Sequence, residues 1–164
     1  MSHPAHTQSA KCKVITVSDT RTQETDKSGA LIKTLLEQSS HEITEYEIVK
    51  DDAMAIQSAI SSALNQENIE VILLTGGTGI ARRDVTFEVV EKVLEKELPG
   101  FGEIFRYLSY EYDIGSAAML SRAIAGTANE KALFSMPGSS GAVKLAMEKL
   151  ILPELSHIVH ELRK

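Results

Sequence analysis

The stretch VILLTGGTG, residues 71–79, joins an apolar run directly to a glycine-rich turn. An apolar run of this kind is typical of a central strand in a parallel sheet, which helices cover on both faces. Glycine adopts positive φ angles at no steric cost and lets the backbone approach a ligand closely. We therefore expect a buried strand that ends in a ligand-binding turn.

Strands and helices alternate along the chain around this stretch. Short β-branched runs indicate strands, and apolar side chains spaced by three and four residues indicate helices. The predicted elements are strands at residues 14–17, 43–49 and 71–74, helices at residues 28–38, 53–65, 85–96 and 101–112, hairpin strands at residues 121–127 and 131–136, and a helix at residues 141–162 that bends at Pro153. This order predicts an α/β fold, a three-layer αβα sandwich with a mostly parallel sheet and one antiparallel hairpin.

Length, charge and cysteine content narrow the class of protein. The chain has 164 residues, which suits a single domain at residues 13–164 behind a flexible tail at residues 1–12. A net charge of −6 disfavours nucleic acid and anionic membranes as partners. The single cysteine, Cys12, and the lack of a secretory or membrane-spanning apolar run predict a cytoplasmic protein.

The glycine-rich turn is a candidate phosphate site. It follows a buried strand and precedes a helix, where backbone N–H groups and the helix N-terminus favour an anion. It is not a Walker A loop, because no Gly-Lys-Ser/Thr follows. A purely structural turn is the alternative. The candidate binding residues are Thr75, Gly76, Gly77, Thr78 and Gly79, with Arg82 and Arg83 as nearby cationic donors.

Carboxylates at two strand ends are candidates for a metal site. Asp84 lies at the start of the predicted helix 85–96, and Asp51 follows the predicted strand 43–49. Helix capping is the alternative role for each, since aspartate is a favourable N-cap. Mg²⁺ is commonly bound by one or two carboxylates together with phosphate oxygens. The sequence predicts Mg²⁺ at Asp51 and Asp84, with Asp52 as the alternative to Asp51.

Two more polar loops are expected at the same edge of the sheet. One follows the first strand, and Ser28 in it is a candidate both for capping its helix and for reaching a ligand. The other follows the hairpin, and its Gly-Ser-Ser-Gly spacing is not that of a nucleophile elbow. The candidate binding residues in the two loops are Ser18, Asp19, Ser28, Gly29, Pro137, Gly138, Ser139 and Ser140.

Taken together, these motifs resemble the MoaB/Mog family of molybdopterin-binding proteins. The most specific element is Thr75-Gly76-Gly77-Thr78-Gly79 followed by Asp84-x-Thr86. The other matching elements are Val17-Ser18-Asp19, Asp26-x-Ser28-Gly29, Pro99-Gly100-Phe101-Gly102-Glu103-x-x-Arg106 and Met136-Pro137-Gly138. The resemblance extends over nearly all of residues 14–150.

The resemblance implies an αβα sandwich that assembles as trimers or hexamers and binds molybdopterin. It further implies that Mg-ATP adenylylates the terminal phosphate of the pterin and releases pyrophosphate, with Asp51 and Asp84 as the catalytic carboxylates. A non-catalytic molybdopterin-binding paralogue of the same fold is the alternative. Ser139-Ser140 stands where many relatives have Asn-Pro or Gln-Pro, and the short C-terminus fits the MoaB branch. Glu103 and Arg106 are candidates for the site, for an oligomer contact or for pairing with each other.

Overall fold

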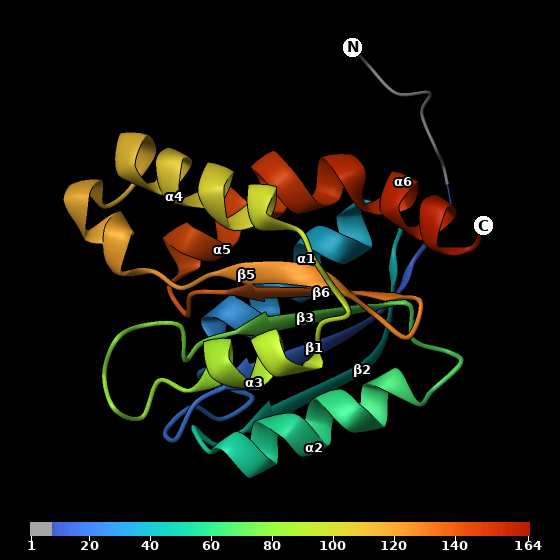
Figure 1. Cartoon of the computed structure of the whole chain (residues 1–164), viewed down its shortest axis with the longest axis horizontal. Helices are drawn as coiled ribbons and strands as arrows, with labels where there is room; N and C mark the ends of the chain where they lie inside the picture. Colours follow the sequence, from blue (N-terminus) through green and yellow to red (C-terminus); the bar gives the residue numbers. More distant parts are fainter. Residues whose placement is uncertain (1–7) are drawn as a thin grey trace.

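The structure is a computed structural model that describes residues 8–164, and its central strand is β3 (Val71–Thr75) (Figure 1). Within these residues, six strands form one sheet in the order β2-β1-β3-β6-β5-β4. β3 is parallel to β1 (Lys11–Val17) on one side and to β6 (Lys131–Met136) on the other. All of its residues are buried, so the predicted central strand is confirmed.

The outer strands complete the mixed sheet. β2 (Glu42–Val49) is a parallel edge strand, which agrees with its alternating polar residues. β5 (Ile124–Ala128) runs antiparallel to β6, and the two-residue strand β4 (Lys96–Glu97) pairs with β5 at the other edge. Asn129 and Glu130 turn the β5–β6 hairpin with φ angles of 49° and 61°. The predicted antiparallel hairpin is therefore confirmed.

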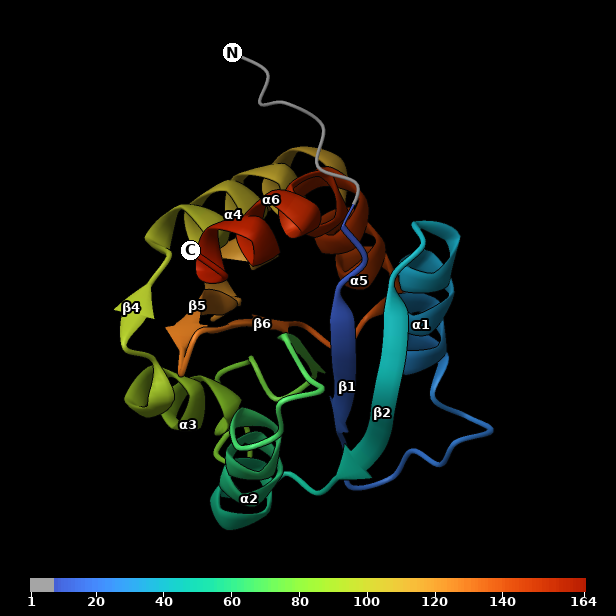
Figure 2. The ribbon, with the colours of Figure 1, turned by 90° about the vertical axis from the view of Figure 1, so that its right-hand side faces the viewer.

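Helices cover both faces of the sheet (Figure 2). Alternate strand residues face opposite sides, which gives two apolar layers. One layer packs under α1 (Lys27–Gln38), α4 (Pro99–Tyr112), α5 (Ser140–Ala146) and α6 (Leu152–Leu162). The other packs under α2 (Ala53–Leu64) and α3 (Thr86–Val93). This arrangement is the predicted three-layer αβα sandwich. In the part of the chain described, no helix is long and apolar enough to cross a membrane.

The N-terminal boundary of the folded part differs from the prediction. β1 begins at Lys11, and Ala10 and Cys12 are fully buried, so residues 10–12 belong to the fold and not to the predicted tail 1–12. The Ala10 N–H donates to His41 Nδ1 at 3.0 Å, which fixes the start of the strand. Burial raises the pKa of the Cys12 thiol to about 12, so this cysteine is a packing residue. Residues 1–7 of the predicted tail lie outside the described residues.

Several helix boundaries also differ. The helix predicted at residues 85–96 ends at Val93, because residues 96–97 pair with β5. Pro99 begins α4, since a proline lacks the N–H that the first turn of a helix leaves unused. The 3-10 helix η1 (Gly115–Leu120) was not predicted. The final helix is interrupted by the π-helical segment η2 (Met147–Ile151), which ends two residues before Pro153, the position at which the sequence predicted a bend.

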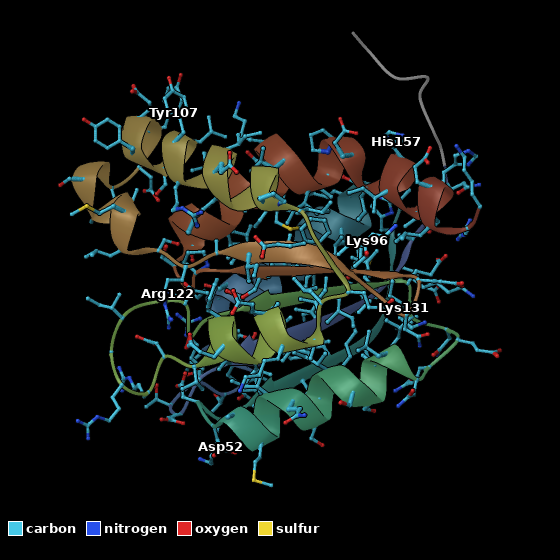
Figure 3. All side chains as sticks on the ribbon, in the orientation of Figure 1. Asp52, Lys96, Tyr107, Arg122, Lys131 and His157 are labelled. Atoms are coloured by element: carbon cyan, nitrogen blue, oxygen red, sulfur yellow. The ribbon has the colours of Figure 1, made fainter. Side chains whose placement is uncertain are left out.

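The strand order places a switch point between β1 and β3. From β1 the chain passes through α1 to β2 on one side, and α2 then carries it back to β3 on the other side. Ligands in open α/β sheets bind at such a point, beyond the carboxyl ends of the strands. Figure 3 shows Asp52, just beyond β2, at this edge and Lys131, the first residue of β6, at the opposite edge.

Candidate functional site

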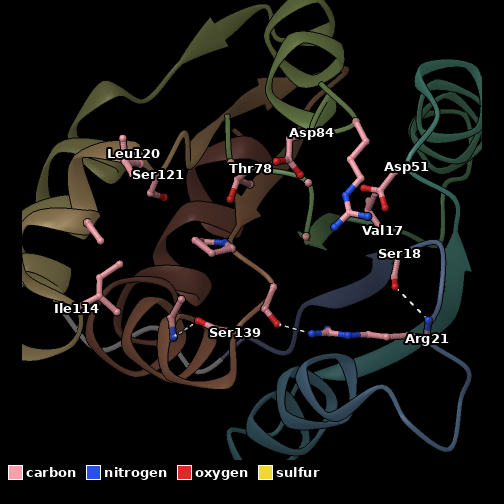
Figure 4. A pocket seen from close by; sticks show the side chains of 18 of the residues that line it. Val17, Ser18, Arg21, Asp51, Thr78, Asp84, Ile114, Leu120, Ser121 and Ser139 are labelled. Atoms are coloured by element: carbon pink, nitrogen blue, oxygen red, sulfur yellow. Dashed lines mark hydrogen bonds between the residues drawn. The ribbon is translucent and has the colours of Figure 1, made fainter. Parts of the chain in front are cut away.

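A cavity of about 490 Å³ lies at the switch point, beyond the carboxyl ends of the parallel strands (Figure 4). The loops after β1, β2, β3 and β6 all contribute residues to its lining. Most of the site residues predicted from the sequence lie on it. They are Ser18, Asp19, Asp51, Gly76, Gly77, Thr78, Gly79, Asp84, Pro137, Gly138 and Ser139.

Four predicted binding residues do not line the cavity. Ser28 Oγ donates to Gly138 O at 2.5 Å, and Thr75 Oγ1 donates to Pro137 O at 2.9 Å. Both hydroxyls therefore bind carbonyl groups of the loop after β6 and do not line the cavity. Gly29 lies in the first turn of α1, and Ser140 is an exposed residue at the start of α5.

The glycine-rich loop presents free backbone donors to the cavity. Gly76 and Gly77 have φ angles of 108° and 71°, a region that favours glycine. The Gly76 N–H donates to Met136 O at 3.0 Å. Among residues 8–164, no hydrogen bond engages the N–H groups of Gly77, Thr78 or Gly79. Successive unengaged N–H groups beside left-handed residues form an anion-binding concavity.

The loop also packs too closely against α3 to accept a side chain at Gly77. A Cβ atom on Gly77 would lie 2.2 Å from Thr86 Oγ1. The Thr86 N–H donates to Gly77 O at 3.2 Å, which joins the loop to the first residue of α3. The glycine is therefore required by sterics as well as by its φ angle.

Helix capping distinguishes Asp52 from Asp51 and Asp84. Asp52 Oδ2 accepts the Ala55 N–H at 2.9 Å and caps α2, so Asp52 has a helix-capping role while Asp51 lines the cavity. Asp84 does not cap α3, whose N-cap residue is Val85 and has no side-chain cap. Instead Asp84 Oδ2 accepts the Ala81 N–H at 3.0 Å and closes a turn. The capping alternative is thus wrong for Asp84.

Negative charge is concentrated around Asp51. Burial and the neighbouring Asp19 and Asp84 carboxylates raise the pKa of Asp51, and only Arg83 opposes them by Coulomb attraction. The Asp51 N–H donates to Asp19 Oδ1 at 3.0 Å. Among the described residues, no group of three or more His, Cys, Asp or Glu has metal-binding geometry. The residues fit Mg²⁺ in the mode where two carboxylates share the ion with phosphate oxygens.

A buried carboxylate behind the cavity orders the loop after β1. Asp26 accepts hydrogen bonds from Thr16 Oγ1 (2.6 Å), Tyr46 Oη (2.5 Å) and the Gly29 N–H (2.9 Å). Burial alone would raise the pKa of Asp26, but these hydrogen bonds outweigh it and lower the pKa. Asp26, and not the predicted Ser28, therefore caps α1. Gly29 leaves room for this carboxylate, since its Cβ would lie 2.2 Å from Asp26 Oδ2.

Arg21 lines the cavity and was missed by the sequence prediction. Its Nη2 donates to Gly138 O at 2.9 Å (Figure 4), and its Nη1 lies 3.6 Å from Asp26 Oδ1. The side chain therefore ties the loop after β1 to the loop after β6. Its position three residues after Ser18, in a loop already expected at this edge, was the available signal.

The sequence prediction also missed an apolar wall. Figure 4 shows Ile114 and Leu120 across the cavity from Asp51 and Asp84. This wall comes from α4, the turn after it, η1 and α5, and its members are Phe105, Ile114, Ala117, Leu120 and Ala142. The cavity thus joins a polar side, suited to phosphates and a cation, to an apolar side, suited to a flat ring system.

Comparison with known proteins places this chain in a family. Residues 13–157 match a family model described as "Probable molybdopterin binding domain". The chain is 60% identical over 154 residues to the molybdenum cofactor biosynthesis protein B of Bacillus cereus, covering 94% of the chain and 91% of that relative. It is 59% identical over 168 residues to the protein of the same name from Bacillus subtilis, covering 100% and 99%.

Solved structures give the same result. A crystal structure of molybdenum cofactor biosynthesis protein B matches with a TM-score of 0.94 at 58% identity, over 97% of this chain and 99% of that one. The tungsten cofactor synthesizing protein MoaB from Pyrococcus furiosus matches with a TM-score of 0.84 at 41% identity, over 96% and 99%. The chain belongs to the MoaB/Mog family of molybdopterin-binding domains.

Proposed function

We propose that the protein binds molybdopterin and transfers the adenylyl group of Mg-ATP to its terminal phosphate, releasing pyrophosphate. The family model supports pterin binding, and the names of the relatives support a role in cofactor biosynthesis. One observation carries the proposal. Gly77, Thr78 and Gly79, whose N–H groups form no hydrogen bond among residues 8–164, line the same cavity as Asp51 and Asp84.

The reaction brings two polyanions together. An oxygen of the pterin phosphate forms a bond to the α-phosphorus of ATP while the bond from that phosphorus to the bridging oxygen breaks. Positioning and charge neutralisation dominate catalysis of such transfers. The N–H groups of Gly77–Gly79 would bind phosphate oxygens, and Arg83 and Arg21 would offset their charge from two other positions on the lining.

Asp51 and Asp84 would hold Mg²⁺ together with the phosphates. When bound, the ion shields the phosphate charge and stabilises the pyrophosphate that leaves. The raised pKa of Asp51 fits this role, because a cation between crowded carboxylates relieves their repulsion. Since no three carboxylates among the described residues have metal-binding geometry, we expect Mg²⁺ to bind tightly only with a polyphosphate present.

The remaining polar loops would hold the pterin. Ser18 and Asp19 lie in the loop after β1, just before Arg21. The Arg21 guanidinium binds the loop after β6, which carries Gly138 and Ser139. The apolar wall opposite gives a flat heterocycle a surface to stack against. This division assigns phosphates to the loop after β3 and rings to the wall formed by α4 and η1.

The proposal includes a cytoplasmic location and assembly as trimers or hexamers. The outer face of α4 and η1 exposes large apolar side chains, a feature typical of protein interfaces. They are Ile104 (50% exposed), Tyr107 (62%), Tyr110 (56%) and Met119 (79%). Sedimentation should show an oligomer that Tyr107→Glu dissociates. A wild-type monomer at micromolar concentration would contradict this part of the proposal.

A product assay tests the enzyme activity. Purified protein is incubated with molybdopterin, Mg²⁺ and ATP labelled in the α-phosphate, and adenylylated pterin and pyrophosphate are measured. Both products should appear in equal amounts. Pterin binding without product would favour the non-catalytic paralogue. Asp84→Ala should abolish turnover and leave the melting temperature near that of the wild type, and wild-type turnover in this variant would refute the role of Asp84.

A further inference from the structure

Arg122 lies between η1 and β5, outside the cavity lining, yet its side chain contacts the loop that carries the anion site. We infer that Arg122 is a positioning residue that fixes the glycine-rich loop and Asp84 relative to each other. The inference rests on the proposed function and deepens it. It concerns how the site is held in place, since Arg122 lies outside the cavity lining.

The contacts of Arg122 all fall on one segment of the chain. Its backbone N–H donates to Thr78 O at 2.9 Å, Nε donates to Gly79 O at 2.9 Å, and Nη2 donates to Asp84 O at 2.7 Å. Nη1 forms an ion pair with Glu88. The guanidinium carbon lies 5.3 Å from the centre of the Phe87 ring. Every donor of this residue that forms a hydrogen bond to the loop binds a main-chain carbonyl.

Main-chain hydrogen bonds, which every Arg122 variant keeps, orient the free N–H groups, and the Arg122 side chain holds the Gly79 and Asp84 carbonyls beside them. A trans peptide is planar, so its C=O and N–H point in opposite directions. The bond to Thr78 O therefore turns the Gly79 N–H away from Arg122. In the same way, the bond from Thr86 N–H to Gly77 O turns the Thr78 N–H away from α3. Each of these free N–H groups is thus oriented by the hydrogen bond that the C=O of the same peptide accepts.

The guanidinium also spans a turn. Gly79 O and Asp84 O lie at the two ends of the segment that contains Arg83 and the Asp84 carboxylate, and both bind the same planar group. A fork of fixed geometry sets the separation of its acceptors, whereas the single ammonium of lysine does not. The spacing between the phosphate site and the metal-binding carboxylate therefore depends on Arg122.

The charge of Arg122 is balanced locally. Glu88 forms an ion pair with Arg122, and the Arg122 side chain is only 30% exposed. The cation is thus committed to the loop and to Glu88, so its removal should affect the ligand through loop geometry. Figure 3 shows Arg122 near α3, on the side of the molecule opposite Lys131 and His157.

Arg122→Ala and Arg122→Lys test the inference with three measurements on the full chain. Within residues 77–85, amide hydrogen exchange at the hydrogen-bonded N–H groups of Ala81 and Asp84 should rise by about tenfold in both variants, because the loop opens locally without the fork. The dissociation constant for inorganic pyrophosphate with Mg²⁺ should rise by about tenfold. The kcat for adenylylation should fall by about 10²-fold, with a smaller change in KM for molybdopterin, since misplacement by about 1 Å costs that much.

Chemical rescue separates positioning from general stability. Millimolar guanidinium chloride should restore part of the pyrophosphate affinity of Arg122→Ala, and the same concentration of sodium chloride should not. Arg163→Ala is the matched control, because Arg163 pairs with Glu70, just before β3 and at the opposite edge of the sheet. It should leave exchange at residues 77–85 and pyrophosphate affinity unchanged.

The outcomes separate this inference from the proposed reaction. Wild-type exchange at residues 77–85 and wild-type pyrophosphate affinity in Arg122→Lys would overturn the role of Arg122. If Arg122→Ala is unfolded, the lysine variant decides the question. If the wild-type protein makes no adenylylated pterin, the proposed function fails, and the exchange and pyrophosphate measurements still test Arg122.

Discussion

Asp26 and Asp51 follow neighbouring strands at the same edge of the sheet, yet their surroundings shift their pKa values in opposite directions. Asp26 is buried and accepts hydrogen bonds from three donors, which lower its pKa. Asp51 is half-buried, faces the cavity and lies near two other carboxylates, which together with burial raise its pKa. The two residues have the same chemistry and opposite electrostatic environments.

The difference separates a structural carboxylate from a functional one. The folded state stabilises the charge of Asp26, so this residue holds the loop after β1 in place. The charge of Asp51 is poorly stabilised by the protein alone, and a bound cation would supply what is missing. Stability and function should therefore respond in opposite ways when each carboxylate is removed.

The largest expected effect is on turnover at Asp51. Asp51→Asn removes the charge and keeps the shape, so adenylylation should fall on the order of 10³-fold. The melting temperature should equal or exceed that of the wild type, because a repulsive cluster has lost one member. Steady-state assays and thermal denaturation measure the two effects. Asp52→Asn should keep its turnover, since asparagine also caps helices well. A clear loss of turnover in Asp52→Asn would contradict the assignment of Asp51, and not Asp52, as the metal ligand.

Asp26→Ala should act mainly on folding. Removing the carboxylate leaves Thr16, Tyr46 and the Gly29 N–H without their acceptor, which should lower the free energy of unfolding by about 3 kcal/mol. Urea denaturation measures the change. Glu24→Ala, at an exposed position in the same loop, should stay within about 0.5 kcal/mol of the wild type. Equal stabilities of the two variants would show that the Asp26 network contributes little.

The dependence of unfolding on pH sharpens the contrast. The lowered pKa of Asp26 gives stability that is present above its unfolded pKa of about 3.9 and is lost as pH falls through the folded value. The deficit of Asp26→Ala should therefore shrink below about pH 4. The raised pKa of Asp51 has the opposite sign, so any advantage of Asp51→Asn at pH 7 should also vanish in acid. Denaturation of the wild type and both variants at several pH values measures the two differences, and a deficit of Asp26→Ala that does not shrink as pH falls below about 4 would contradict this account.

The smallest effect is expected at His41, on the far edge of the sheet. Burial lowers the pKa of His41, and its Nδ1 accepts the Ala10 N–H only when that nitrogen is unprotonated. Stability should fall as pH drops below about 6.5, by at most about 1.4 kcal/mol per pH unit. Comparing unfolding of the wild type and His41→Gln at pH 7.5 and 5.5 isolates this contribution. An identical slope in the variant would assign the effect to other groups.

The fold was largely predictable because its signals are local. Apolar runs and helical spacing indicated each parallel strand and most helices, and β3 is fully buried as expected. The two residues of β4 are too short to carry a periodic pattern, and they form a strand only because β5 lies beside them. The π-helical segment before Pro153 likewise depends on how the last helices pack.

The polar side of the site was predictable from strand ends, and the rest was not. Asp51 and the glycine-rich loop follow parallel strands, so their common edge could be inferred. Phe105 and Leu120 reach the cavity through packing of α4 and η1, which the sequence does not specify. Arg122 precedes an antiparallel strand, so it lies at the edge where parallel strands end. A search restricted to residues after strands cannot find it.

The position of Arg122 in the chain has a consequence for the order of assembly. The residue that binds Gly79 O is separated from it by 43 positions. It reaches the loop only when β5 has paired with β6, which in turn pairs with β3. During synthesis from the N-terminus, the glycine-rich loop therefore leaves the ribosome well before its partner. A nascent chain that ends at residue 121 would carry Asp84 and the whole loop, and would still lack the side chain that we infer fixes them relative to each other.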